Sequence, residues 1–219
     1  MKERLLVTVT YAQSIDGRIA TKTGESQWIS GEETLQLAQE LRRDHHAIAV
    51  GVNTVLRDNP ALTCRLPNSS SPLRVIFDTE LRTPLDRQVI TSATDWPTVF
   101  LCRAGIDEGL KAAMHREGVE TVEIPKGEHG GLSIEEALTR LRTRGIETLL
   151  VEGGRGLITS FLHQGKVNRL IVVTAPIIIG EGISAVGELE TLDLNQAIKT
   201  RVKSVRSMGR DVVWDLQIQ

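Results

Sequence analysis

One strand-to-helix junction constrains the fold of this 219-residue chain more than any other feature. The apolar run 149–151 is followed by Glu152, by three glycines within four positions, and then by the amphipathic segment 157–163. This order predicts a buried strand, a tight turn and the start of a helix. Glycines at such a turn let the backbone N–H groups of a helix N-terminus approach a phosphate closely.

The same junction has a simpler interpretation. Glycine-rich turns of this kind are common in α/β proteins, where they let a helix pack close to a sheet, and the spacing G-G-x-G is neither G-x-G-x-x-G nor a P-loop. From these residues alone, a nucleotide or phosphate cradle with Glu152 beside the reacting group and a plain packing turn both stay open.

The rest of the chain alternates between strand and helix patterns before it ends in strands. Strands are predicted at 5–12, 47–52, 73–77, 98–102, 119–124 and 148–151. Helices are predicted at 30–43, 53–59, 107–117 and 133–144, and residues 13–27 are predicted to form a loop. Three further strands at 167–175, 201–207 and 211–218 follow with little helix between them. This order predicts an α/β fold with a mostly parallel central sheet flanked by helices and an antiparallel C-terminal ribbon. Because no internal repeat or separating linker is found, we expect one domain over residues 1–219.

Composition and charge exclude several classes of protein. A formal net charge of −2 and an aromatic content of 3% give neither a basic surface nor a stacking platform, so we expect no nucleic-acid partner. The longest apolar stretch, 170–179, is broken by Pro176 and is too short to span a bilayer, and the N-terminus has no signal-peptide pattern. Because Cys64 and Cys102 are far apart, we predict reduced thiols and a cytoplasmic location.

Two familiar kinds of site are not indicated. The five histidines show no i, i+4 pair and no Cys–His cluster, and the zinc-deaminase signature is not found, so no metal site is predicted. The chain also has no G-x-S-x-G motif of a serine hydrolase.

Other candidate residues have both a plain and a functional interpretation. Asp16 begins an Asp-Gly turn pair, and Trp28 either anchors its loop to the core or packs against a flat ligand. Arg42 ends a helix, where a basic residue suits the dipole. Arg57 and Arg65 flank a short loop and could grip a phosphate together with Arg42, because guanidinium groups match phosphate oxygens.

Taken together, these segments resemble the reductase domain of riboflavin biosynthesis, which is related in fold to dihydrofolate reductase. The resemblance rests on an ordered set of motifs that covers nearly the whole chain: residues 12–20, 24–29, 41–42, 54–63, Arg65, 74–78, 151–154, 175–176 and Gly180.

The resemblance implies NADPH-dependent reduction of a ribosylamino-pyrimidine 5′-phosphate to its ribitylamino form, with ring opening and hydride transfer to the former anomeric carbon. The residues implied to bind the cofactor are Ala12, Trp28, Thr54, Asp58, Thr79, Gly154, Arg155, Gly156 and Leu157. The residues implied to bind the substrate are Ser26, Arg42, Leu62, Arg65 and Glu152. Asp16 and Glu152 are the candidates for orienting or protonating the substrate. A homodimer is also implied.

Several alternatives stay open. Thr10 stands where bacterial two-domain members often carry a lysine, and the deaminase half is not part of this sequence, so the pyrimidine could be aminated or deaminated. Arg82 or Arg103 could bind a 2′-phosphate, which leaves the choice of NADPH over NADH unproven. A diverged dihydrofolate-reductase-like enzyme and a non-catalytic nucleotide-binding subunit are the competing hypotheses; Arg42 and Arg65 favour a phosphorylated substrate.

Overall fold

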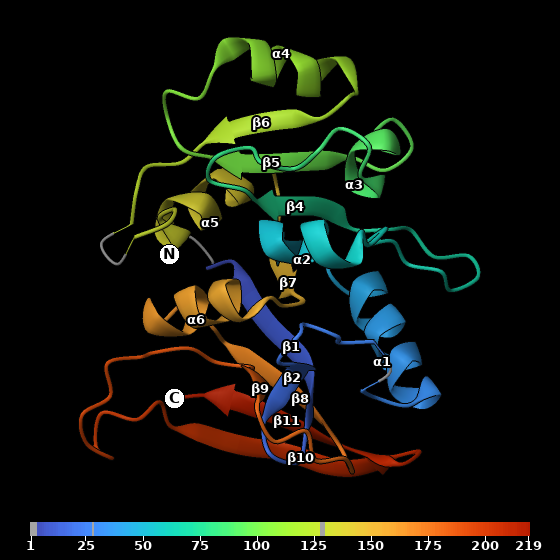
Figure 1. Cartoon of the computed structure of the whole chain (residues 1–219), viewed down its shortest axis with the longest axis vertical. Coiled ribbons are helices and arrows are strands. Elements are labelled where there is room, and N and C mark those ends of the chain that lie inside the picture. Colours follow the sequence, from blue (N-terminus) through green and yellow to red (C-terminus); the bar gives the residue numbers. More distant parts are fainter. Residues whose placement is uncertain (1–3, 28, 128–129) are drawn as a thin grey trace. The chain divides into compact units, whose positions relative to one another are not determined.

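The computed structural model describes residues 4–27, 29–127 and 130–219, and the chain divides into two compact units (Figure 1). Unit 1 comprises Leu41–Leu150 together with the residues before Leu6, and unit 2 comprises Leu6–Glu40 and Val151–Gln219. The boundaries therefore fall within helix α1 (Glu32–Arg43) and strand β7 (Thr148–Val151).

Unit 1 is built on a parallel sheet (Figure 1). Its strands run side by side in the order β3 (Ala47–Gly51), β4 (Leu73–Phe77), β5 (Thr98–Cys102) and β6 (Glu120–Glu123). Almost every residue of β3, β4 and β5 is buried, as expected for parallel strands that are covered on both faces. The helices of this unit are α2 (Val52–Asp58), α3 (Gln88–Thr91), α4 (Glu108–Arg116) and α5 (Ile134–Arg142).

Local side-chain chemistry explains where these helices begin and end. The Asp107 carboxylate accepts a hydrogen bond from the Leu110 N–H at 2.9 Å, and the Ser133 hydroxyl accepts one from the Glu136 N–H at 3.3 Å. The helix start predicted at residue 133 is thus confirmed, with Ser133 as the N-cap of α5. Helix α2 ends at Asp58, and its C-cap Asn59 has a left-handed backbone (φ 42°) that turns the chain away before Pro60.

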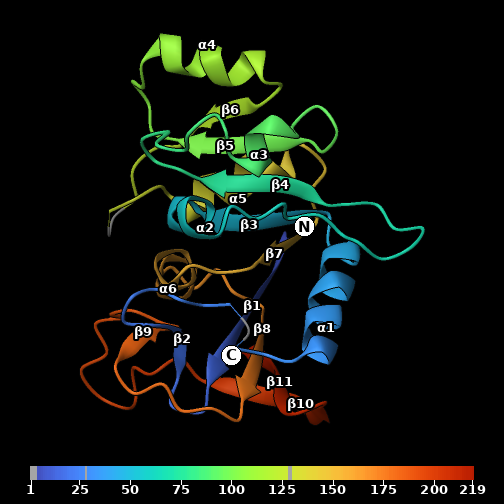
Figure 2. The ribbon, with the colours of Figure 1, turned by 45° about the vertical axis from the view of Figure 1, so that its right-hand side comes forward.

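Unit 2 contains the C-terminal ribbon. Its strands lie in the order β10 (Thr200–Met208), β11 (Asp211–Ile218), β8 (Arg169–Ala175) and β1 (Leu6–Ser14). Strands β1 and β8 are parallel to each other, whereas β11 is antiparallel to both β8 and β10. Helix α6 (Arg155–His163) follows β7, and a separate pair is formed by β2 (Arg18–Thr21) and β9 (Gly182–Ser184), which lie side by side in Figure 2.

The predicted α/β class, with a parallel sheet and antiparallel C-terminal strands, is confirmed. The predicted loop at 13–27 was wrong in part, because it contains β2 and the last residues of β1. Strand β2 has four residues and pairs with a strand more than 160 residues away, so no local pattern reveals it. Within the described ranges, no helix is long and apolar enough to cross a membrane.

Candidate active site

The residues singled out from the sequence fall in both units. Unit 1 holds Arg42, Thr54, Asp58, Leu62, Arg65 and Thr79. Unit 2 holds Ala12, Asp16, Ser26, Glu152, Gly154, Arg155, Gly156 and Leu157. Trp28 lies outside the described residues. The two groups are therefore described separately.

The glycine turn of unit 2 has the backbone that the sequence predicts. Gly153 has φ 103° and Gly154, the N-cap of α6, has φ 72°. Residues that carry a side chain rarely adopt these backbone conformations. No side-chain hydrogen bond caps α6 among the described residues. A Cβ atom built on Gly153 or Gly156 would meet no heavy atom within 4 Å, so open space lies beside this turn. An anion fits such a position, because the first N–H groups of a helix lack intrahelical partners.

Neighbouring residues frame this turn. Glu152 is half-buried and directly follows the buried β7 residues Leu149–Val151. Leu157 anchors the first turn of α6 in the core, and the Thr159 hydroxyl accepts a hydrogen bond from the Gly187 N–H at 2.8 Å. Ala12, in register with Val173 of β8, is half-buried toward the carboxyl end of β1.

Asp16 ties the turn after β1 to the segment that follows β8. Its Oδ1 accepts hydrogen bonds from the Ser14 hydroxyl at 2.5 Å and the Ile179 N–H at 3.1 Å, and its Oδ2 accepts one from the Gly180 N–H at 2.7 Å. The Ser14 hydroxyl, followed by the two backbone donors, lowers the Asp16 pKa to about 2. Arg18 reinforces the connection by donating from Nε to the Gly180 carbonyl at 2.9 Å. The Asp-Gly pair is thus a tertiary anchor, and its carboxylate is ionised at neutral pH.

In unit 1, the segment around Leu62 is held by two arginines. Leu62 is buried and has a left-handed backbone (φ 56°), which is strained for a leucine. On one side, Arg74 Nη1 donates to the Ala61 carbonyl at 3.1 Å, and on the other, Arg42 Nη1 donates to the Thr63 carbonyl at 3.0 Å. Part of the Arg42 guanidinium therefore supports the loop that carries Leu62.

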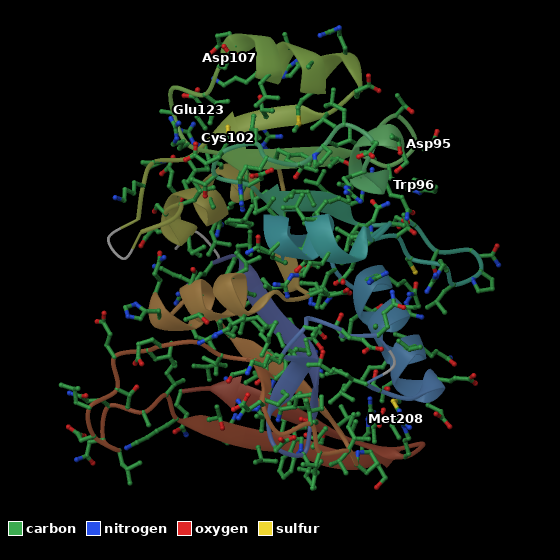
Figure 3. The ribbon with its side chains drawn as sticks, in the orientation of Figure 1. Asp95, Trp96, Cys102, Asp107, Glu123 and Met208 are labelled. Atoms are coloured by element: carbon green, nitrogen blue, oxygen red, sulfur yellow. The ribbon has the colours of Figure 1, made fainter. Side chains whose placement is uncertain are left out.

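Arg74 is a supporting residue whose structural role sequence reasoning missed. Its side chain is 0% exposed, and the indole ring of Trp96, in the turn before β5 (Figure 3), lies 5.9 Å from its guanidinium carbon. Its described hydrogen-bond acceptors are carbonyl or hydroxyl oxygens of Ala61, Val89, Ser92, Trp96 and Thr98. Burial lowers the Arg74 pKa to about 10, so the group stays charged at neutral pH. The one sequence signal that could have revealed this role is an arginine at the start of an otherwise apolar strand.

The other unit 1 candidates lie on turns and helix ends. Thr54 is in the first turn of α2, and Asp58 is the last residue of that helix. Thr79 lies two residues beyond β4, and its carbonyl accepts a hydrogen bond from the Arg103 N–H at 3.1 Å. Arg65 is exposed on the loop after Leu62, and in unit 2 Ser26 is half-buried.

Comparison with known families matches the RibD C-terminal domain over residues 6–214 of this chain. The chain belongs to the RibD C-terminal domain family.

Among the described residues, no group of three or more His, Cys, Asp or Glu side chains is placed to hold a metal ion.

The relatives of this chain differ in how much of their own length it covers. The riboflavin biosynthesis protein RibD of Aquifex aeolicus is 37% identical over 213 residues, which is 97% of this chain and 57% of that protein. The chain thus spans little more than half the length of the first curated relatives it matches. The 2,5-diamino-6-ribosylamino-4(3H)-pyrimidinone 5′-phosphate reductase of Methanothermobacter thermautotrophicus is 34% identical and matches over 99% of both chains.

A solved structure supports the same grouping. The deaminase/5-amino-6-(5-phosphoribosylamino)uracil reductase of Thermotoga maritima superposes with a TM-score of 0.80 at 26% identity, covering 99% of this chain and 57% of that one.

Proposed function

We propose that this chain reduces a ribosylamino-pyrimidine 5′-phosphate to its ribitylamino form with NADPH, as a step of riboflavin biosynthesis. The observation that carries the proposal is the end-to-end similarity to the Methanothermobacter reductase, which is named for this kind of substrate. The open glycine turn at the start of α6 supports it, because a dinucleotide cofactor needs a site for its pyrophosphate.

The chain's own residues fit a dinucleotide. The N–H groups of the turn from Gly154 to Leu157 would bind the pyrophosphate, since the open space beside Gly156 admits phosphate oxygens. The residues proposed to contact the rest of the cofactor are Ala12, Trp28, Thr54, Asp58 and Thr79. When bound, NADPH supplies the hydride, and the protein supplies position and charge.

The residues proposed to bind the substrate have two roles: two arginines would bind the 5′-phosphate, and Glu152 would lie near the reacting carbon. Arg42 and Arg65 would bind the 5′-phosphate, because guanidinium groups form paired hydrogen bonds with phosphate oxygens. Leu62 and Ser26 would line the rest of the substrate. Glu152, at the end of β7, would orient the sugar or deliver a proton to it.

Asp16 receives a different role from Glu152. Its pKa of about 2 means that it holds no proton to deliver at neutral pH. We propose that Asp16 fixes the backbone at Ile179 and Gly180, to which it is hydrogen-bonded.

The test is NADPH oxidation by the purified protein, with the aminated and the deaminated ribosylamino-pyrimidine phosphates offered separately. Turnover of one substrate would support the reductase and identify which pyrimidine it accepts. Arg65→Ala should then raise the KM for the phosphorylated substrate about 10-fold or more, since it removes a charged hydrogen-bond partner. If neither substrate is turned over although NADPH binds, the proposal fails and a diverged reductase or a binding subunit replaces it.

We also propose that the chain forms a homodimer through the C-terminal ribbon of unit 2. Apolar side chains of β10 and β11 are solvent-exposed in the single chain: Val202 by 55%, Val205 by 46% and Trp214 by 38%. Val205 and Trp214 are in register on neighbouring strands, so they form one continuous apolar patch.

A further inference from the structure

The turn that follows β4 is built rigidly. Asp78 is fully buried, and its Oδ2 accepts hydrogen bonds from the Thr83 N–H at 2.8 Å and the Thr83 hydroxyl at 2.7 Å. Leu81 is 2% exposed, has a left-handed backbone (φ 49°) and donates its N–H to the Asp78 carbonyl at 3.1 Å. Arg82 stands between these two anchored residues, and its side chain is exposed. The position of its backbone is therefore fixed in advance of any ligand.

This turn lies where parallel sheets bind ligands. The carboxyl ends of β4 and β5 are at the same edge of the unit 1 sheet (Figure 1), and ligands of open α/β sheets bind outside that edge. Arg82 Nη2 donates to the Asn53 side-chain oxygen at 3.4 Å, which connects the turn to the start of α2. Asn53 precedes Thr54, and Thr79 belongs to the turn, so Arg82 lies between two segments that the proposed function assigns to the cofactor.

The second nearby arginine has its charge compensated. Arg103 Nε lies 2.8 and 3.0 Å from the two carboxylate oxygens of Glu80, and its Nη1 donates to the Ala104 carbonyl at 2.9 Å. The hydrogen bond from Arg103 is also the main cause that lowers the Glu80 pKa, with the charge of Arg82 a smaller one. Arg82, by contrast, has a neutral amide as its hydrogen-bond partner in the described part of the chain. Of the two arginines, Arg103 forms the ion pair with Glu80, and the charge of Arg82 is the less compensated one.

We infer that Arg82 binds the 2′-phosphate on the adenosine ribose of the cofactor and so selects NADPH over NADH. The inference rests on the proposed function. A guanidinium group pairs with the dianionic phosphate through parallel hydrogen bonds, whereas the 2′-hydroxyl of NADH carries no charge to compensate. The neighbouring Glu80 does not repel this phosphate strongly, because Arg103 neutralises it.

The test is calorimetric titration with adenosine 2′,5′-bisphosphate and, separately, with adenosine 5′-monophosphate. We expect Arg82→Gln to weaken binding of the bisphosphate about 10-fold or more while the monophosphate is unaffected, because only the former carries the 2′-phosphate. Arg82→Lys should retain an intermediate preference. The double variant Glu80→Gln/Arg103→Gln is the matched control. It removes the ion pair without leaving a charged Glu80 that could pair with Arg82. We expect this variant to bind the bisphosphate more tightly than the monophosphate, as the wild type does.

Three outcomes would overturn the inference. Arg82→Gln could leave the preference for the bisphosphate over the monophosphate intact, or it could weaken the binding of both nucleotides equally. Alternatively, the preference could be lost in the double variant instead. In each case the wild-type preference for the bisphosphate would still support NADPH use, so the proposed function would stand. A wild-type protein that binds the two nucleotides equally would overturn both.

Discussion

At the scale of single residues, buried or ionised polar groups fix the turns that carry the candidate site. Asp16 holds the segment after β8, Asp78 holds the turn after β4, and Arg74 holds the loop that contains Leu62. Asp78 and Arg74 are fully buried, and a buried polar group that is left unpaired costs about 1–3 kcal/mol. Their contribution is therefore to specify loop conformation.

Replacing Arg74 should destabilise the protein severely. Arg74→Met keeps much of the side-chain volume but removes the guanidinium that donates to the carbonyls of Ala61 and Val89. We expect the free energy of unfolding to fall by about 3 kcal/mol or more, as measured by urea denaturation. Arg140→Met is the control, because Arg140 forms an exposed ion pair with Glu136 that is worth at most about 1 kcal/mol. Equal losses in the two variants would contradict the role assigned to Arg74.

The lowered pKa of Asp16 predicts a pH-dependent contribution to stability. A carboxyl whose pKa is lower in the folded state stabilises the protein fully above its unfolded pKa of 3.8 and loses that effect as the pH falls to about 2. The melting temperature of Asp16→Asn should therefore lie below that of the wild type at pH 5, and the gap should narrow between pH 3.8 and about 2. Thermal melts at several pH values measure this, and a gap that stays constant would exclude an ionised Asp16 as the anchor.

At the scale of elements, local patterns predicted most helices and strands, and long-range contacts decided the rest. Strand β7, the glycine turn and α6 were predicted together because the turn and its flanking apolar residues are contiguous in sequence. Strands β2 and β9 were missed because each is short and depends on its distant partner. The four-residue helix α3 was missed because it is too short to show a periodic pattern.

Helix α1 shows how a cap can come from a distant strand. The sequence predicts a helix that begins at residue 30, but the helix begins at Glu32, and the contacts described at its start come from Asp211, the first residue of β11. Its Oδ2 accepts hydrogen bonds from the Gly31 N–H and the Thr34 hydroxyl, both at 2.7 Å. No pattern near residue 30 could reveal an acceptor about 180 residues away.

Removing the Asp211 side chain should lower the free energy of unfolding more than removing a helix cap that is local in sequence. Asp211 is fully buried and satisfies two donors, so Asp211→Ala should lower the free energy of unfolding by about 2–3 kcal/mol. Asp107→Ala, which removes the local cap of α4, should cost about 1 kcal/mol. Chemical denaturation of both variants makes the comparison. A larger loss for Asp107→Ala would contradict the assignment of Asp211 as the main anchor of α1.

A substitution in helix α6 should change protein stability and cofactor affinity in opposite directions. Gly156 is helical with open space around its missing Cβ, so Gly156→Ala should stabilise the protein by about 0.4–1 kcal/mol. The same methyl group would occupy the space proposed for the pyrophosphate, so NADPH affinity should fall about 10-fold or more. Melting temperature and calorimetric titration measure the two effects. Gly109→Ala, at the same position of α4, should leave NADPH affinity unchanged, and an unchanged affinity in Gly156→Ala would place the pyrophosphate elsewhere.

At the scale of the whole molecule, the candidate residues are divided between two units that alternate along the chain. The sequence suggests these residues only through the order of the motifs, because a set such as Asp16, Arg42, Leu62, Thr79 and Glu152 has no local spacing that defines a site. What the sequence could not supply are the bonds that shape the loops, such as Arg74 to the Ala61 carbonyl. Such bonds join residues from different elements, and only the folded chain brings them together.

The exposed apolar side chains of β10 and β11 make the proposed homodimer testable. If Val202, Val205 and Trp214 are buried between two copies of the chain, a polar residue at Val205 should weaken the dimer, because burying an unpaired amide costs about 1–3 kcal/mol. We expect light scattering to show a dimer of the 24.1-kDa wild-type chain and a shift toward monomer in Val205→Gln. Arg206→Gln is the matched control, because adjacent residues of a strand point to opposite faces of the sheet. A monomeric wild type, or equal shifts in both variants, would mean that this apolar patch is not the dimer interface.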